Sequence, residues 1–246
     1  MGYLMSIDEV GMFMASDNDR PVLIFDVNET LLDIDALQPL FQSIFGQPNR
    51  MREWFAQLIL YTQALSLSRR YAPFEALGGG VLRMLGEIHG VTVSNDDVRA
   101  LGAAVSTLPL HPDVAPALNQ LGSAGFRMVT LTNSSGGGGR DPLADARVAH
   151  HFEHRFTVAQ VGSFKPSPAT YQQVTDTLGT RPECCLLIAA HTWDTLGAQA
   201  MGWKAALVTR GANAPLEVEN LHRPDFVEVD LARLTSALIS RFRNAT

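Results

Sequence analysis

Four short apolar runs, each followed by polar residues, are spaced along the chain. They occupy residues 21–27, 127–133, 184–190 and 204–210. Continuous apolar runs of this length are typical of strands covered on both faces, as in a parallel sheet. Segments of helical pattern precede the last three runs. The sequence therefore predicts an α/β fold with a doubly wound, Rossmann-like parallel sheet.

Capping residues mark the ends of three helices in this pattern. Proline is favoured at the first helical position, serine just before it, and glycine just past the last turn. The predicted helices run from Pro112 to Gly122 or Gly125, from Ser167 to Gly179, and from Trp193 to Met201.

The segment 33–108 contains no run of the buried-strand kind. Its apolar residues recur at helical spacing, as in 54–65, and breaks are predicted at Pro73 and at 78–80. A small helical cap inserted after the first strand explains this pattern. The predicted domains are an α/β core at 17–36 and 109–246 and a helical cap domain at 37–108.

The amino-acid composition limits the partners and the cellular location that are expected for this chain. The chain has 246 residues, 46% of them hydrophobic, and a net charge of −6, with no local concentration of lysine and arginine. Nucleic acid is therefore not an expected partner, and no run approaches the ~20 apolar residues of a membrane span. The only cysteines, Cys184 and Cys185, are adjacent and point to opposite faces of a strand. Since they form neither a disulfide nor a chelate in that position, a cytoplasmic location is expected.

Polar residues collect where the apolar runs end, which is where open α/β sheets bind ligands. A strand-terminal aspartate by itself is more often a helix cap, but several polar residues in this order favour a common site. With one lysine that precedes a predicted helix, they are Asp26, Thr132, Asn133, Lys165, His191 and Asp194.

Other polar and glycine-rich features are interpreted as surface. His150, His151 and His154 are predicted on a polar helix end, and Arg69–Arg70 on a solvated one. The glycine stretch 136–139 is interpreted as a flexible loop, with an anion-binding nest as the alternative.

Four motifs in this set are similar to those of the haloacid dehalogenase superfamily. They are residues 26–33 (Asp-Val-Asn-Glu-Thr-Leu-Leu-Asp), 131–133 (Leu-Thr-Asn), 164–166 (Phe-Lys-Pro) and 191–194 (His-Thr-Trp-Asp). Within the superfamily, the cap position and the run Lys165-Pro-x-Pro-x-x-Tyr171 resemble the type II 2-haloacid dehalogenases. The resemblance implies a haloacid dehalogenase core, a small carboxylic acid as substrate and a homodimer.

Superfamily phosphatases provide the nearest alternative. The resemblance places their general acid two residues after the nucleophile and a second metal-holding acid in the fourth motif, where this chain has Asn28 and Ala190. An amide cannot act as a general acid and a methyl group cannot bind a hard cation. No metal site and no cofactor are therefore expected, and Mg²⁺ is expected only for a phosphatase.

The resemblance implies hydrolysis of a short 2-haloalkanoic acid through an ester on Asp26. Asp26 attacks the carbon bearing the halogen, and water then attacks the ester carbonyl. Lys165 keeps Asp26 ionised and stabilises the oxyanion, and Asp194 anchors Lys165 or orients the water. Thr132 and Asn133 hold the carboxylate geometry. Substrate binding is predicted for Asn28, Gln63, Leu65, Ser134, Tyr171, His191 and Trp193.

The chain departs from the type II pattern at the halide-binding positions. Asn28 stands where a tyrosine is typical, Leu65 where the cap arginine falls, and Ala189 and His191 where serine and asparagine are typical. Replacement donors are His191, Gln63, Asn133, Trp54 and Trp193, although Trp54 is interpreted as core. Three functions stay open: a divergent dehalogenase, a phosphatase or other small-acid hydrolase, and a non-catalytic binding protein.

Overall fold

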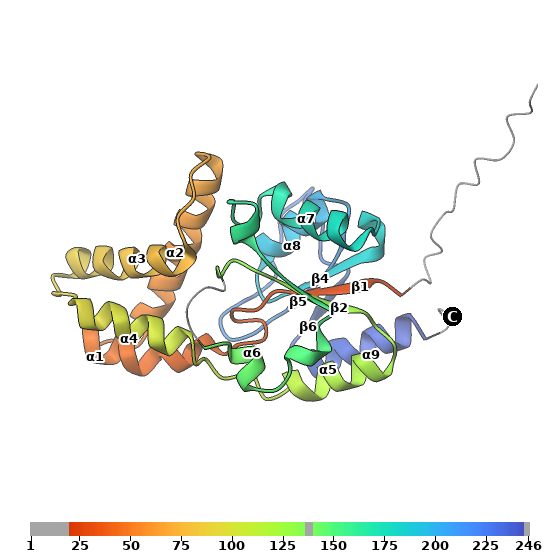
Figure 1. Cartoon of the computed structure of the whole chain (residues 1–246), viewed down its shortest axis with the longest axis horizontal. Helices are drawn as coiled ribbons and strands as arrows, with labels where there is room; N and C mark the ends of the chain where they lie inside the picture. Colours follow the sequence, from red (N-terminus) through yellow and green to blue (C-terminus); the bar gives the residue numbers. More distant parts are fainter. Residues whose placement is uncertain (1–19, 136–139, 244–246) are drawn as a thin grey trace, which may run out of the picture.

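A six-stranded, wholly parallel sheet forms the centre of the molecule (Figure 1). The computed structural model describes residues 20–135 and 140–243, so the prediction for the loop 136–139 lies outside the described residues. The strand order is β3-β2-β1-β4-β5-β6. The strands are β1 (Val22–Phe25), β2 (Met128–Thr132), β3 (His154–Thr157), β4 (Cys185–Ala189), β5 (Lys204–Val208) and β6 (Phe226–Glu228).

The four predicted strands are confirmed and are the four central ones. The edge strands β3 and β6 were not predicted, because Phe156 is the only buried residue of β3 and β6 has none. A strand covered on one side only gives no continuous apolar run. His154 was predicted on a helix end, which is wrong, because His154 begins β3. Its ring centroid lies 4.1 Å from that of Phe156, with the two rings tilted by 50°.

Helices cover both faces of the sheet (Figure 1). Successive residues of β1 point to opposite faces, so Leu23 and Phe25 join one buried cluster while Val22 and Ile24 join the other. Helices α5 (Val114–Ser123) and α9 (Leu231–Arg241) cover the first face, with the short α6 (Pro142–Asp145) near its edge, and α7 (Pro168–Leu178) and α8 (Thr192–Ala200) cover the second. The three helices predicted from capping residues correspond to α5, α7 and α8.

Four further helices lie to one side of the sheet (left in Figure 1). They are α1 (Gln38–Phe45), α2 (Arg50–Leu67), α3 (Phe74–His89) and α4 (Asn95–Val105), and a 3₁₀ turn (Ile34–Leu37) leads into them. All four fall within 37–108, while the division into two domains stays a prediction.

The predicted break at Gly78–Gly80 is wrong, because these glycines lie inside α3. Trp54 is buried, as predicted, and donates from Nε1 to the Gly78 carbonyl over 2.9 Å. A Cβ at Gly79 would lie 2.9 Å from Val98 Cγ1. The glycines therefore let α2 and α4 approach α3 closely, and this packing outweighs their low helix propensity.

In the described ranges, no helix is both long and apolar enough to cross a membrane. Cys184 and Cys185 are free thiols, and burial raises the pKa of Cys185 to about 12.

Candidate active site

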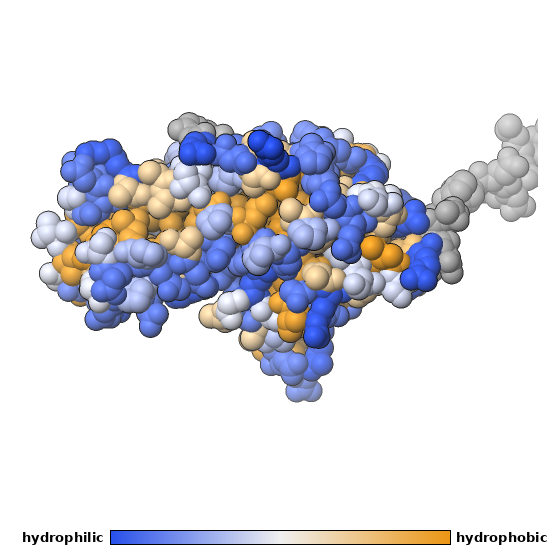
Figure 2. Space-filling model, turned by 90° about the horizontal axis from the view of Figure 1, so that it is seen from below, coloured by the Kyte–Doolittle hydropathy of each residue, from blue (hydrophilic) through white to orange (hydrophobic). Residues whose placement is uncertain are grey.

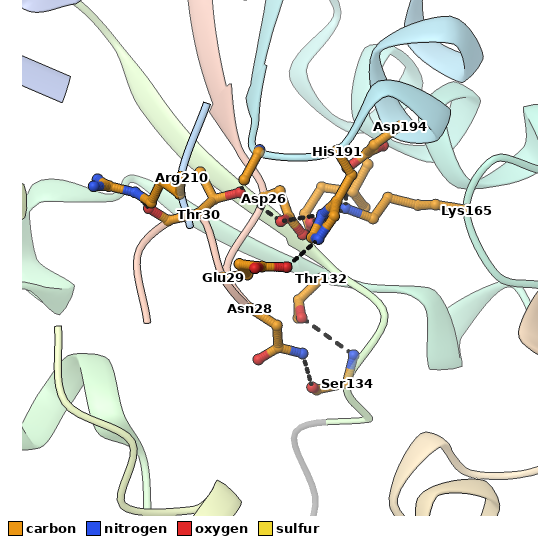
Figure 3. A network of polar contacts seen from close by, with 12 residues as sticks. Asp26, Asn28, Glu29, Thr30, Thr132, Ser134, Lys165, His191, Asp194 and Arg210 are labelled. Carbon is orange, nitrogen blue, oxygen red and sulfur yellow. Dashed lines mark hydrogen bonds and ion pairs between the residues drawn. The ribbon is translucent and has the colours of Figure 1, made fainter. Parts of the chain in front are cut away.

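Asp26 lies at the carboxyl end of β1 with both carboxylate oxygens occupied (Figure 3). Oδ1 accepts a hydrogen bond from Lys165 Nζ at 2.8 Å, and Oδ2 accepts one from Thr30 Oγ1 at 2.7 Å. Thr30 is itself fixed, because its hydroxyl accepts the Ala190 N–H at 2.9 Å and its carbonyl accepts from Arg210. The carboxylate of Asp26 is thus held by Lys165 and by Thr30, and Thr30 is in turn held by the segments that follow β4 and β5.

Lys165 is completely buried, and its ammonium group has three acceptors. They are Asp26 Oδ1, Asp194 Oδ2 at 2.5 Å and the Leu131 carbonyl at 3.0 Å. The Lys165 backbone N–H donates to Asn133 Oδ1 at 3.0 Å, which fixes the loop before α7 against the end of β2. All three N–H groups of a buried ammonium are therefore satisfied.

Asp194 lies in the first turn of α8 and contacts no solvent. Its Oδ1 accepts from the Tyr171 hydroxyl at 2.8 Å, while Oδ2 contacts Lys165. A Cβ at Gly197 would collide with Tyr171 and Pro166, so glycine at this position allows α8 to approach α7 closely enough for the Tyr171 contact. Since both oxygens are engaged, the geometry favours anchoring of Lys165 over orienting a water.

The pKa shifts in this cluster indicate which of its groups are charged at neutral pH. Burial by itself raises the pKa of Asp26, but the Lys165 ammonium and the His191 ring outweigh it and hold that pKa well below its ordinary value. Burial lowers the pKa of Lys165, but Asp194 and Asp26 raise it above its usual range. Burial raises the pKa of Asp194, partly opposed by Lys165. At neutral pH, Asp26 is a carboxylate and Lys165 an ammonium ion.

His191 lies at the N-terminus of α8, beside Asp26. Its Nδ1 is 3.7 Å from Asp26 Oδ2 and has no hydrogen-bond partner among the described residues, while Nε2 is 2.7 Å from Glu29 Oε2. Burial lowers the pKa of His191, but Asp26 and Glu29 outweigh it and raise that pKa to about 9. His191 therefore carries a positive charge at neutral pH.

Sequence analysis missed Glu29, Thr30 and Arg52. Glu29 is buried between His191 and Arg52 of α2. Glu29 and Thr30 stand in the polar stretch directly after the first apolar run, so their position was a usable signal. Arg52 had no such signal, because only the tertiary structure brings α2 to this loop.

Asn28, Thr132 and Ser134 form a second group, below Asp26 in Figure 3. Asn28 Nδ2 donates to Ser134 Oγ at 3.0 Å, and the Ser134 N–H donates to Thr132 Oγ1 at 3.1 Å. All three line a cavity of about 630 Å³ between the sheet and helices α2, α3 and α4. Apolar residues from both sides line the rest, including Trp54, Leu58, Phe74 and Leu101.

Asp26 and Lys165 do not line that cavity. Asp26 is 4% exposed and is therefore almost completely buried beside the cavity-lining residues Asn28 and Thr132. Figure 2 shows apolar side chains exposed along the side of the molecule seen from below, from the helices at 38–105 toward the sheet.

Two of the predicted substrate-binding residues lie apart from this site. Gln63 and Leu65 are half-buried in α2, and Leu65 packs against the main hydrophobic cluster. Neither lines the cavity nor makes a polar contact with the Asp26 cluster in the described part of the chain. Arg52 is the α2 residue that reaches the loop after β1. Trp193 does lie at the site, stacked 5.1 Å from the His191 ring.

The donor set does not fit a hard cation. Within residues 20–135 and 140–243, no three His, Cys, Asp or Glu side chains are grouped so that they could hold a metal ion. The two carboxylates that face each other, Asp26 and Asp194, share the Lys165 ammonium between them. That ammonium occupies the place where a cation would need to sit.

Comparison with known sequences points to one family. The family model of the haloacid dehalogenase-like hydrolases matches residues 21–202. The chain is 28% identical over 209 residues to (S)-2-haloacid dehalogenase H-109 of Pseudomonas putida, covering 81% of this chain and 93% of that protein. It is 28% identical over 196 residues to (S)-2-haloacid dehalogenase 1 of Pseudomonas sp. (strain CBS-3), covering 79% and 86%.

Solved structures share the fold. The L-2-haloacid dehalogenase of Xanthobacter autotrophicus with covalently bound chloropropionic acid has a TM-score of 0.80 and 23% identity, over 90% of this chain and 98% of that one. A haloacid dehalogenase-superfamily phosphatase of Thermococcus onnurineus has a TM-score of 0.57 and 17% identity, over 89% and 97%. The predicted fold class is confirmed.

Proposed function

The chain belongs to the haloacid dehalogenase-like hydrolases, and we propose that it cleaves the carbon–halogen bond of a short 2-haloalkanoic acid through an ester on Asp26. The observation that supports this most is the state of Asp26. Its carboxylate is fixed by Lys165 and Thr30, and the cation beside it keeps the pKa low. A carboxylate that stays ionised and pre-oriented is the nucleophile that displacement at carbon requires.

In the first step, an Asp26 oxygen attacks the carbon that bears the halogen, on the side opposite the halogen. The new C–O bond forms as the carbon–halogen bond breaks, and the halide leaves with the bonding electrons. No proton is needed. His191 Nδ1, which has no acceptor among the described residues, lies 3.7 Å from Asp26 Oδ2 and supplies a charged N–H for the departing anion.

In the second step, water adds to the ester carbonyl carbon of Asp26. Lys165 Nζ, 2.8 Å from Asp26 Oδ1, stabilises the oxyanion that forms there. The bond between that carbonyl carbon and the alkyl oxygen then breaks. The 2-hydroxy acid leaves with one proton from the water, the other proton is released to solvent, and Asp26 is regenerated as a carboxylate. The substrate carboxylate is assigned to the Thr132 and Ser134 side of the site, where both residues line the cavity.

A phosphatase mechanism needs groups that this site does not supply. Asn28 binds Ser134 through its amide and carries no proton to give to a leaving alcohol. Ala190 offers only its backbone, whose N–H is bound to Thr30. Dehalogenation needs neither a general acid nor a divalent cation.

The test is halide release from 2-chloro- and 2-bromopropionate. Asp26→Asn is expected to lose at least about 10³-fold in rate with the fold retained, because the amide is nearly isosteric but a poor nucleophile. Asp176→Asn, on the exposed side of α7, is the matched control and should keep the full rate.

A single turnover in H₂¹⁸O adds a direct readout. Mass spectrometry of the peptide containing Asp26 should show a gain of one ¹⁸O, because water enters at its carbonyl carbon. Label in the product hydroxyl and none on Asp26 would contradict the ester. Phosphate release that depends on Mg²⁺ would favour the phosphatase instead.

A further inference from the structure

Glu29 is a buried carboxylate in an unusual backbone conformation. It is 2% exposed, and its φ of 68° lies in the left-handed region, which residues other than glycine and asparagine rarely adopt. His191 Nε2 lies 2.7 Å from its Oε2, and the Arg52 guanidinium contacts its Oε1. A strained residue persists where the surroundings hold it firmly, and such residues cluster at functional sites.

Arg52 reaches this loop from α2. In addition to Glu29, the Arg52 guanidinium binds Asp35, with Nη2 2.7 Å from Asp35 Oδ1. It also lies against Gly211, after β5, where a Cβ would come within 2.9 Å of Arg52 Nη2. The guanidinium of one helical residue therefore meets three segments: the loop after β1, the 3₁₀ turn and the loop after β5.

The charges around the His191 ring do not balance unless the ring is protonated. Three buried carboxylates lie in this cluster, and two cations with fixed charge contact them. Arg210, which contacts the Thr30 carbonyl, is balanced by its own ion pair with Asp113. The carboxylates are Asp26, Glu29 and Asp194, and the cations are Lys165 and Arg52. Asp35 is 40% exposed in its side chain, so water screens it. An imidazolium supplies the missing positive charge, and an unbalanced buried charge is costly.

Aromatic rings close the remaining sides of His191. Phe55 of α2 lies 5.6 Å from the His191 ring centroid, and Trp193 of α8 lies 5.1 Å from it. With these rings and Glu29 in place, Nδ1 is the ring nitrogen left without a hydrogen-bond partner in the described residues. It is also the nitrogen nearer to Asp26 Oδ2.

We propose that Glu29 and Arg52 are positioning residues for the dehalogenation: Glu29 holds His191 as an imidazolium beside Asp26, and Arg52 holds Glu29 from α2. The proposal rests on the function proposed above. Glu29 orients the ring through Nε2 and leaves the Nδ1–H for the leaving halide. Arg52 ties α2 to this arrangement, so the helices at 38–105 and the nucleophile are held in one fixed geometry.

The first experiment measures the protonation of His191 directly. Histidine labelled with ¹⁵N is followed by NMR from pH 5 to pH 10, and the His191 signal is assigned by its loss in His191→Gln. In the wild type its midpoint is expected near the pKa of about 9 that Asp26 and Glu29 produce. In Glu29→Gln the midpoint should fall by more than one pH unit. The matched control is Glu53→Gln, whose carboxylate pairs with Arg50 and His89 instead.

The second experiment follows halide release against pH. With Glu29→Gln, kcat should fall at least about threefold at pH 8.5 and stay close to the wild-type value at pH 6, where the imidazole is still protonated. Arg52→Gln should lower kcat at every pH without lowering the His191 midpoint, because it loosens Glu29 but leaves its charge. Arg50→Gln, two residues away on the same helix, is the control and should keep the wild-type profile.

Two results would overturn the proposal: a wild-type His191 midpoint near the ordinary value of about 6.5, or a Glu29→Gln midpoint equal to that of the wild type. If the glutamine variant does not fold, Glu29→Gly serves instead, because glycine adopts a φ of 68° without strain. The titration needs no substrate. Failure of halide release in the wild type would therefore refute the proposed function and leave this test intact.

Discussion

Replacing Lys165 by methionine removes the cation on which the buried cluster depends. Methionine keeps an unbranched side chain of similar length, so the change is mainly one of charge. Lys165 is fully buried and lies 2.8 Å from Asp26 and 2.5 Å from Asp194. Without it, the two carboxylates face each other in a site without solvent. Removing one partner of a buried ion pair costs about 3–5 kcal/mol, so the free energy of unfolding at pH 7 should fall by that amount.

The loss of stability in Lys165→Met should depend on pH in a definite direction. In the wild type the pKa of Asp26 is lowered, so its ionised form contributes stability that is complete above its unfolded pKa of about 4 and is lost as the pH falls through the folded value. In Lys165→Met the carboxylates lose their shared cation, so their pKa values rise and a proton is taken up. The difference from the wild type is therefore largest at neutral pH and shrinks toward pH 4.

Urea unfolding followed by circular dichroism at pH 7 and pH 4.5 measures this difference. Arg127→Met is the control, because Arg127 forms an exposed ion pair with Glu153 and is itself 53% exposed. The free energy of unfolding of this control variant should fall by less than about 1 kcal/mol. The charge argument is wrong if the free energy of unfolding of Lys165→Met lies within about 1 kcal/mol of the wild-type value at pH 7. It is also wrong if the variant loses the same free energy of unfolding at both pH values. Halide release should fall by at least about 10²-fold in the same variant.

Three further predictions follow from the same site and from the helical insert. His191→Ala should lower kcat about 10²-fold, the scale of one lost transition-state hydrogen bond. The wild-type rate should fall as the pH rises through about 9, where His191 loses its proton. An unchanged rate in His191→Ala would contradict the contact between His191 and the halide. Exhaustive dialysis against EDTA should leave halide release within twofold, and a restoration of more than tenfold by Mg²⁺ would point to a phosphatase. Gly79→Leu should destabilise the protein by ~1–3 kcal/mol in thermal unfolding through overpacking, because a Cβ there lies 2.9 Å from Val98; Gly80→Ala, with nothing within 4 Å, is the control and should not destabilise.

The sequence alone determined the central strands and the chemistry at their ends. A strand covered on both faces must be apolar throughout, so residues 21–27 and 184–190 could be recognised without knowledge of their neighbours. The carboxyl ends of parallel strands meet at one edge, so Asp26 and Asp194 were expected at a common site. The structure brings both to Lys165. The roles assigned to them, the homodimer and the cellular location stay predictions.

Only the tertiary structure decided which side chains complete the site. Leu65 was expected beside the leaving anion from its register in the helical insert, but it packs in the hydrophobic cluster while Arg52 of the same helix reaches Glu29. The face that α2 presents to the sheet depends on its packing against α3, where Trp54 binds the Gly78 carbonyl. Helical periodicity shows which residues share a face but not which neighbour that face meets. The contact of Arg52 with Glu29 joins residues 23 positions apart, and its partner is fixed by the folded chain rather than by any local pattern.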